Sequence, residues 1–346
     1  MTDTSSCPCG KCVDFHAHFL QREVFDTGHR HSVSSCFGRN LLSTDNPVFR
    51  RMFDPALQVA DMDARGIDLH VLSSADVIQS RSWATPRDEA RLSALVNNEC
   101  VRWIDLHPDR FVGSAVLPLG DMRLALAELD CAEAMGLRVV ELPSNHRGAY
   151  LGDARFDDLW SAIRERGLVA FIHPEGTTDM WFQDYALWNS IGQSIEEVKV
   201  MSSLIYEGVM DRHAGVRIVM AHDGGYMPHY MGRLDRNVLD KPFTTKNISR
   251  RPSEYLRDFH YDSCVYDPRT LELLVERVGA DRVVLGGDYP VGGFDPLAFI
   301  GQADLDEGQR NAIAGGNAMR LLGLLPIADA IADAIAADAA AQDIRA

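Results

Sequence analysis

The stretch Val13-Asp14-Phe15-His16-Ala17-His18-Phe19 decides the fold prediction, because it is typical of a buried β-strand that carries two histidines at its end. Side chains alternate across a strand, so His16 and His18 project to the same side. Two neighbouring imidazoles leave ring nitrogens without partners unless something binds them, and a metal ion is the natural candidate. One core histidine beside one solvent-facing histidine is the competing interpretation, and this short motif alone does not exclude it.

Apolar runs that predict strands alternate with helical patterns along most of the chain. The predicted strands cover residues 13–19, 67–73, 110–118, 137–143, 168–173, 216–222, 259–265 and 282–288. The predicted helices follow Pro55 and Pro86 and cover residues 122–135, 156–166, 198–212, 227–238, 268–278 and 307–322. Eight strand-then-helix units are the signature of an α/β protein with a (β/α)8 TIM barrel. A doubly wound sheet lacks support, because no Gly-rich phosphate loop follows the first strand.

Functional residues of such a barrel gather at the C-terminal ends of its strands. His16 and His18 lie at the end of the first strand, and His173, His222 and Asp288 end the fifth, sixth and eighth. This coincidence favours the metal interpretation over scattered core histidines.

Three histidines and a carboxylate form a ligand set suited to one divalent metal, Zn²⁺ first, with Mn²⁺ or Fe²⁺ possible. We expect His16, His18, His173 and Asp288 to be the ligands, with one coordination position left for water or substrate. Two roles remain open for His222, an acid/base beside the metal or a further ligand in a two-metal site.

Composition limits the partners. The chain has 346 residues, 46% of them hydrophobic and 24% charged, with a formal net charge of −16. That charge disfavours nucleic acid and anionic membranes, so a small-molecule substrate or another protein is expected. No apolar run is long enough to cross a bilayer and no secretory signal pattern is present, which predicts a cytoplasmic protein. Seven cysteines form no recognisable disulfide framework.

The chain divides into three predicted parts. Residues 1–12 are expected to be a flexible N-terminal lead-in, residues 13–324 a single barrel domain, and residues 325–346 a helical tail. Cys7, Cys9 and Cys12 in the lead-in lack the second cysteine pair of a closed zinc site, so exposed thiols are the preferred interpretation.

Insertions are predicted after strands one, five and six. The polar stretch 21–53 has little periodicity, and its Asn46, Arg50 and Arg51 are candidate substrate contacts or part of a solvated turn. The aromatic stretch 177–197, which includes Trp181, is expected to cover the site or to contact a second subunit. The basic stretch 240–257 either reaches a neighbouring protomer or is solvated.

Four motifs carry a resemblance to a known family. They are 14–18 (Asp-Phe-His-Ala-His), 172–174 (Ile-His-Pro), 221–225 (Ala-His-Asp-Gly-Gly) and 286–290 (Gly-Gly-Asp-Tyr-Pro). Together they resemble the amidohydrolase-2 branch of the amidohydrolase superfamily, closest to decarboxylases of the 2-amino-3-carboxymuconate-6-semialdehyde type and related non-oxidative decarboxylases. The resemblance implies a barrel with one divalent metal, usually zinc, the four ligands named above, His222 as acid/base residue, and a homodimer or an assembly of dimers.

The motifs that would bind the substrate depart from that family. Two arginines are expected there, one of them supplied across the dimer, but Asn46 occupies the first position and the second falls near Arg236 or Lys241. Glu175 follows the His173-Pro174 pair where the semialdehyde decarboxylase type has an aromatic residue. A buried glutamate near the metal repels carboxylates, which argues against the same dicarboxylic substrate.

The expected function is metal-dependent, non-oxidative decarboxylation of a small aromatic or ene-type carboxylic acid. The same site would also suit a hydrolase that cleaves an amide, a lactone or a ring-cleavage product, or a hydratase, through a metal-activated water. A silent barrel that serves as a scaffold would be expected to have a broken ligand set, whereas all four ligand types are present.

Overall fold

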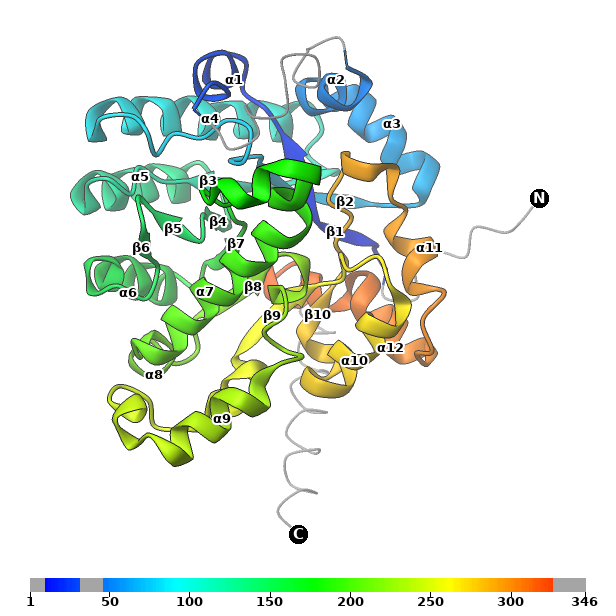
Figure 1. Cartoon of the computed structure of the whole chain (residues 1–346). Coiled ribbons are helices and arrows are strands. Elements are labelled where there is room, and N and C mark those ends of the chain that lie inside the picture. Colours follow the sequence, from blue (N-terminus) through cyan, green and yellow to red (C-terminus); the bar gives the residue numbers. More distant parts are fainter. Residues whose placement is uncertain (1–9, 32–45, 326–346) are drawn as a thin grey trace.

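Eight parallel strands form one sheet that closes into a barrel (Figure 1). The computed structural model describes residues 10–31 and 46–325, so the predictions for residues 1–9, including Cys7 and Cys9, for residues 32–45 of the first insertion and for residues 326–346 lie outside the described part. Cys12 is described and is buried just before β1, so the prediction of an exposed thiol is wrong for this residue. The strands, in their order around the barrel, are β1 (Val13–Phe19), β2 (Leu69–Ser74), β3 (Phe111–Val116), β4 (Val139–Leu142), β7 (Val169–Ile172), β8 (Arg217–Met220), β9 (Phe259–Asp262) and β10 (Val283–Val284).

Backbone hydrogen bonds join the last strand unit to the first. The Phe15 N–H donates to the Leu285 carbonyl at 2.8 Å, and the His18 N–H donates to the Tyr289 carbonyl at 2.8 Å. The predicted (β/α)8 barrel is therefore confirmed, and each predicted strand matches one of these eight. A short hairpin outside the barrel, β5 (Asn145–His146) with β6 (Ala149–Tyr150), was not predicted.

Helices surround the strands, and several begin at a capping residue followed by proline, as at Asp54-Pro55, Thr85-Pro86 and Asp267-Pro268. In the described part they are α1 (Arg22–Gly28), α2 (Pro47–Phe53), α3 (Pro55–Arg65), α4 (Pro86–Leu106), α5 (Met122–Ala134), α6 (Asp157–Glu165), α7 (Gln193–Tyr206), α8 (Val209–Arg212), α9 (Met231–Asp240), α10 (Pro268–Val278), α11 (Pro296–Ile300), α12 (Glu307–Asn311) and α13 (Asn317–Leu321). None of these helices is long and apolar enough to span a membrane.

Capping side chains and one glycine explain two places where the observed helices differ from the predicted ones. The stretch 21–53 contains α1 and α2, because Gln21 and Asn46 cap them through hydrogen bonds to the Val24 and Val48 N–H groups. The predicted helix 198–212 is divided into α7 and α8 at Gly208, whose φ of 79° ends the first helical segment.

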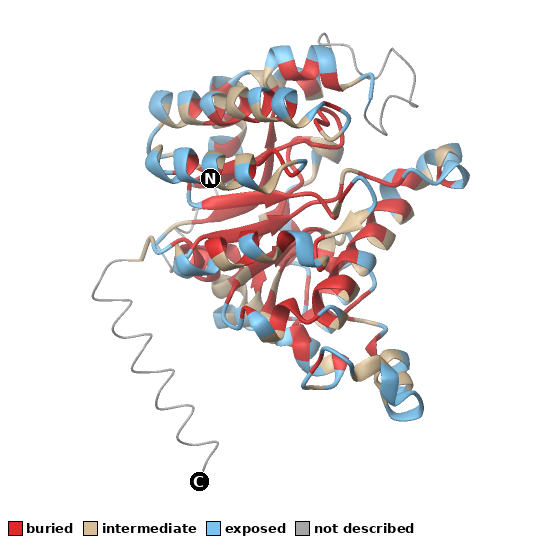
Figure 2. Cartoon of the chain, turned by 90° about the vertical axis from the view of Figure 1, so that its left-hand side faces the viewer, coloured by how far each residue is buried: buried red, intermediate tan, exposed pale blue. Residues whose placement is uncertain are grey.

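Apolar side chains form two main layers of core. One cluster, which includes Phe15, Val71, Val139 and Phe171, involves the barrel strands together with α13. A larger cluster packs the strands against the surrounding helices. Figure 2 shows this arrangement as buried strands with helices exposed along their outer faces. The packed interior leaves the strand ends as the place for a functional site.

Candidate active site

Four buried side chains meet at the C-terminal mouth of the barrel. His16 and His18 come from β1, His173 follows β7, and Asp288 follows β10; one ligand atom from each lies within 4.8 Å of those of the others. The Nε2 atoms of His16 and His18 are 3.2 Å apart. Asp288 Oδ1 lies 3.0 Å from His18 Nε2 and 3.4 Å from His16 Nε2. We refer to these four residues as the ligand cluster.

The outer ring nitrogens hold two of the imidazoles in place. His16 Nδ1 lies 2.7 Å from Asp262 Oδ2, and His173 Nδ1 lies 3.0 Å from the Pro174 carbonyl oxygen. Carboxylate and carbonyl acceptors fix the proton on Nδ1, which leaves each Nε2 with a lone pair for the cluster. This is the usual orientation of metal-binding histidines.

Glycines let the chain bring Asp288 to the cluster. The Asp14 carboxylate accepts hydrogen bonds from the His16 and Gly287 N–H groups, both at 2.9 Å, and so connects β1 to the segment after β10. A Cβ at Gly287 would overlap this carboxylate. Asp288 itself has a φ of 48°, a left-handed conformation that is uncommon for residues other than glycine and is found at functional sites.

The charges of the cluster also suit a cation. Burial raises the pKa of Asp288, but the hydrogen bond to His18 and the nearby imidazoles outweigh it and hold that pKa well below its usual range. Burial lowers the pKa of His16, and burial together with the neighbouring imidazoles lowers that of His173. Neutral imidazoles beside an ionised carboxylate are the protonation states that metal binding requires.

His222 packs against the cluster without being part of it. Its ring centroid lies 5.1 Å from that of His16 and 5.2 Å from that of His173. Its Nδ1 lies 2.6 Å from Oε1 of Glu197, a carboxylate on α7 that is fully buried. Burial opposes a charge on His222, but Glu197 outweighs it and raises the pKa of His222 to about 10 in the metal-free protein. The pair therefore retains a proton that can be donated.

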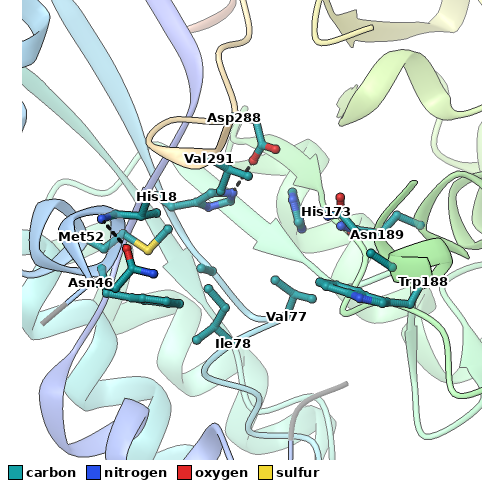
Figure 3. A pocket seen from close by; sticks show the side chains of 15 residues that line it. His18, Asn46, Met52, Val77, Ile78, His173, Trp188, Asn189, Asp288 and Val291 are labelled. Carbon is teal, nitrogen blue, oxygen red and sulfur yellow. Dashed lines mark hydrogen bonds and ion pairs between the residues drawn. The ribbon is translucent and has the colours of Figure 1, made fainter. Parts of the chain in front are cut away.

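Two cavities open on this centre, and both reach Asp288, Asn189, Gln193 and Val291. The apolar pocket has a volume of about 290 Å³. Figure 3 shows Met52, Val77 and Ile78 on one side of it and Trp188 on the other. The residues that line it are His18, Asn46, Val48, Phe49, Met52, Ala75, Val77, Ile78, His173, Ala186, Trp188, Asn189, Gln193, Asp288 and Val291. The polar cavity, of about 640 Å³, includes His222, Asp223, Tyr226 and His229 in its lining.

The Amidohydro_2 family model, described as amidohydrolase, matches residues 13–324. The chain belongs to this amidohydrolase family. A relative from Dictyostelium discoideum, 2-amino-3-carboxymuconate-6-semialdehyde decarboxylase, is 28% identical over 332 residues, which cover 91% of this chain and 92% of the relative.

Two solved structures have the same fold as this amidohydrolase. The 5-carboxyvanillate decarboxylase of Sphingomonas paucimobilis superposes with a TM-score of 0.82 at 24% identity, over 91% of this chain and 99% of the other. The dihydroxybenzoic acid decarboxylase of Polaromonas sp. JS666, solved with bound manganese, superposes with a TM-score of 0.76 at 20% identity, over 91% of this chain and 97% of the other.

The substrate contacts predicted in the first insertion lie in different environments. Asn46 lines the apolar pocket of this amidohydrolase. Arg51 instead directs its Nε to Asp61 Oδ2 at 2.6 Å, and Arg50 is exposed. Neither arginine is among the described residues that line the two cavities.

The remaining predicted contacts also lie outside those linings. Glu175 accepts a hydrogen bond from the Ser82 hydroxyl at 3.1 Å. Trp181 is 69% exposed. Arg236 pairs with Asp240 at 2.8 Å on α9, and Lys241 at the end of that helix is also exposed. Whether these side chains reach the site of a neighbouring subunit stays a prediction.

The structure adds residues that the sequence did not single out. Asp262 orients His16, Glu197 orients His222, and Gln193 lines the apolar pocket. Trp188 also lines that pocket, and it belongs to the aromatic stretch 177–197 that was expected to cover the site. Asp262 lies inside the predicted strand 259–265, and only the shorter observed strand β9 (Phe259–Asp262) places it at a strand end. Glu197 and Gln193 lie on a helix, where nothing in their spacing marks them.

Proposed function

We propose that this amidohydrolase is a metal-dependent decarboxylase that releases CO₂ from a small aromatic carboxylic acid without an oxidant. The observation that carries the proposal is the buried ligand cluster with a proton-retaining histidine packed against it and a small apolar pocket beside it. The likeness to a decarboxylase over nine-tenths of both chains supports it.

The chemistry of the cluster fits a divalent cation. The Nε2 atoms of His16 and His18 converge with Asp288 Oδ1, which is itself an acceptor and cannot satisfy the lone pair of an imidazole nitrogen. The ion would be held by the ligand cluster, that is, by His16, His18, His173 and Asp288. We propose that the ion is zinc, because three of the four ligands are imidazole nitrogens, and manganese is the other candidate. When bound, the ion supplies positive charge that orients an anionic substrate.

The proton chemistry belongs to His222 and Glu197. Decarboxylation replaces the bond between the ring carbon and the carboxylate by a bond to hydrogen, so one proton enters the ring as CO₂ leaves. Glu197 holds His222 through Nδ1, which keeps the Nε2 proton for the substrate carbon. Asp288 lines both cavities, and its negative charge favours the protonated state of His222.

Hydrolysis or hydration would use the same residues with water as the nucleophile. The apolar pocket favours decarboxylation of an aromatic acid instead, because most of its wall is hydrocarbon that suits a ring.

A substrate panel with two variants tests the proposal. Hydroxybenzoic acids, amides and lactones are supplied to the metal-loaded protein, and CO₂ and the organic product are measured. We expect CO₂ from at least one aromatic acid. His222→Asn should keep its metal while the rate falls by about 10²–10⁴-fold, and Asp288→Ala should lose both metal and activity. Hydrolysis of an amide or lactone with no CO₂ from any acid would overturn the proposal.

We further propose that the enzyme acts in the cytoplasm as a homodimer. Met180, Trp181 and Tyr185 in the insertion after β7 are 70%, 69% and 92% exposed, and exposed apolar groups of this kind are typical of protein interfaces. Light scattering of the purified chain should give twice the monomer mass, and a monomer at micromolar concentration would contradict the assembly.

A further inference from the structure

Three side chains that belong to neither the ligand cluster nor the pocket lining connect the two. We propose that Arg51, Asp61 and Tyr289 form a bridge that holds helix α2 in place against the segment that carries Asp288. They would then be positioning residues for the bound ring. The inference deepens the proposed function and rests on it, because the wall formed by α2 would contact the ring of the substrate. The proposed reaction itself gives these three residues no role.

Helix α2 (Pro47–Phe53) is too short to hold its own position. It has seven residues, and isolated helices shorter than about 12–15 residues are only marginally stable in water. Two of its side chains, Phe49 and Met52, are at least nine-tenths buried and line the apolar pocket. The position of this pocket wall therefore depends on the contacts that fix α2 to the rest of the chain.

Two sets of contacts fix α2. The Met52 carbonyl accepts a hydrogen bond from the Leu20 N–H at 2.7 Å, just beyond β1. The second set begins at Arg51, whose Nη1 donates to the Pro47 carbonyl of the same helix at 3.0 Å. The Nε of Arg51 donates to Oδ2 of Asp61 at 2.6 Å. Asp61 lies on α3, which runs beside α2 (Figure 1), so Arg51 joins the two helices.

Asp61 also joins α3 to the segment after β10. The same Oδ2 atom accepts a second hydrogen bond, from the Tyr289 hydroxyl at 2.7 Å. Burial opposes a charge on Asp61, but the hydrogen bonds from Tyr289 and Arg51 outweigh it and lower the pKa of Asp61. Water screens the partly exposed Arg51 side chain, whereas Tyr289 is 2% exposed. Hydrogen bonds to an ionised acceptor are stronger than neutral ones, so one oxygen can hold both partners.

Tyr289 directly follows Asp288, and its backbone is bound to both histidines of β1. The Tyr289 N–H donates to the His16 carbonyl at 3.1 Å, and the Tyr289 carbonyl accepts a hydrogen bond from the His18 N–H at 2.8 Å. An ion held by these metal ligands would therefore fix the position of Tyr289 as well. Through the bridge, the same ion would set the distance between the ligand cluster and the pocket wall on α2.

This distance matters because the ring has to lie at a fixed place relative to the metal and the proton donor. A misplacement of about 1 Å, caused by a mutation remote from the chemistry, can cost about 10²-fold in rate. Loss of the bridge should therefore loosen α2 and weaken binding of the ring while every metal ligand remains.

Two variants break the bridge without removing a metal ligand. Asp61→Ala removes the shared acceptor, and Tyr289→Phe removes a single hydroxyl. In zinc-loaded protein, amide hydrogen exchange in residues 47–53, measured by mass spectrometry, should be about threefold or more faster in Asp61→Ala than in wild type. Zinc affinity should stay within about threefold of wild type in both variants, because all four ligands remain.

Asp63→Ala is the matched control. Asp63 lies on the same helix as Asp61 and pairs with Arg110 Nη1, also at 2.6 Å. This variant should leave exchange in α2 and zinc affinity at their wild-type values. Chelation should raise exchange in α2 in wild type and in Asp63→Ala, but should add little in Asp61→Ala, in which the bridge is already broken.

Calorimetry with benzoic acid measures the effect on the pocket. Its affinity for the zinc-loaded protein should fall about threefold or more in Asp61→Ala and in Tyr289→Phe, and the double variant should be no weaker than Asp61→Ala, because both changes act through one oxygen. Asp63→Ala should bind benzoic acid as wild type does.

Wild-type exchange in α2 together with wild-type affinity for benzoic acid in the bridge variants would overturn the inference, even when CO₂ is released from an aromatic acid. Loss of zinc affinity in Tyr289→Phe would also overturn it, since Tyr289 would then act on Asp288 alone. Faster exchange and weaker binding without CO₂ from any acid would support the bridge and overturn the proposed function instead. If Asp61→Ala does not fold, Tyr289→Phe decides, and if benzoic acid does not bind to wild type, exchange in α2 decides.

Discussion

At the scale of single residues, the contact between His222 and Glu197 determines how the proton donor behaves. Glu197 is fully buried and lies 2.6 Å from the ring nitrogen of His222, so its charge acts with little screening by water. Burial alone lowers the pKa of a histidine, and Glu197 reverses that effect. Glu197 is therefore a positioning residue, whose contribution is measurable through His222.

Glu197→Gln keeps a hydrogen-bonding group of similar shape and removes the charge. Because the Glu197 carboxylate raises the pKa of His222, its loss should lower that pKa, and His222 should lose its proton at a lower pH. We expect kcat to fall by about tenfold or more, with the alkaline limb of the kcat–pH profile moved toward acid, while KM and metal content stay near wild type. Glu197→Asp should restore part of the rate. An unshifted alkaline limb would mean that Glu197 only fills space.

At the scale of elements, strand ends could be predicted well and helix interiors could not. The His-x-His motif in β1 and the residues after β7, β8 and β10 were identified because a buried strand followed by a polar residue is a clear pattern. Gln193 and Glu197 lie on α7, where most positions serve packing, so their role depends on which neighbours the fold provides. α1 was missed because it is seven residues long and has a weak apolar pattern.

The path of the chain between β10 and Asp288 depends on residue 287 being a glycine, which has no side chain. A Cβ at Gly287 would overlap the Asp14 carboxylate, which connects this segment to β1. Gly287→Ala should therefore displace Asp288 and lower metal affinity although all four ligands remain, at a stability cost of about 1–3 kcal/mol. Metal titration and urea unfolding measure the two effects. Gly301→Ala, where the nearest atoms are 3.4 Å or more away, is the control and should be close to neutral. Wild-type metal affinity in Gly287→Ala would contradict this account.

At the scale of the whole molecule, the ligand cluster lies across the closure of the barrel. His18 and Asp288 are 270 positions apart in sequence yet 3.0 Å apart in space, since one belongs to the first strand and the other follows the last. A cation bound there would connect the two ends of the barrel sheet as well as serve chemistry. Binding to the folded state alone stabilises a protein by RT ln(1 + [L]/Kd), which is about 2.7 kcal/mol at a hundredfold excess over Kd.

Chelation should therefore loosen the closure before the rest of the barrel. Removal of the metal is expected to lower Tm by several degrees and to raise amide hydrogen exchange first at His18 and Tyr289, whose backbone groups join β1 to the segment after β10. Amides in β3 and β4, on the far side of the strand order, should change least. Asp288→Ala is the matched control: it lacks one ligand, so chelator should shift its Tm little. The contradicting outcome is that chelator changes neither the Tm nor the exchange pattern of wild-type protein that started fully loaded with metal. The closure would then be held by its backbone hydrogen bonds alone. The ion would then serve the reaction only.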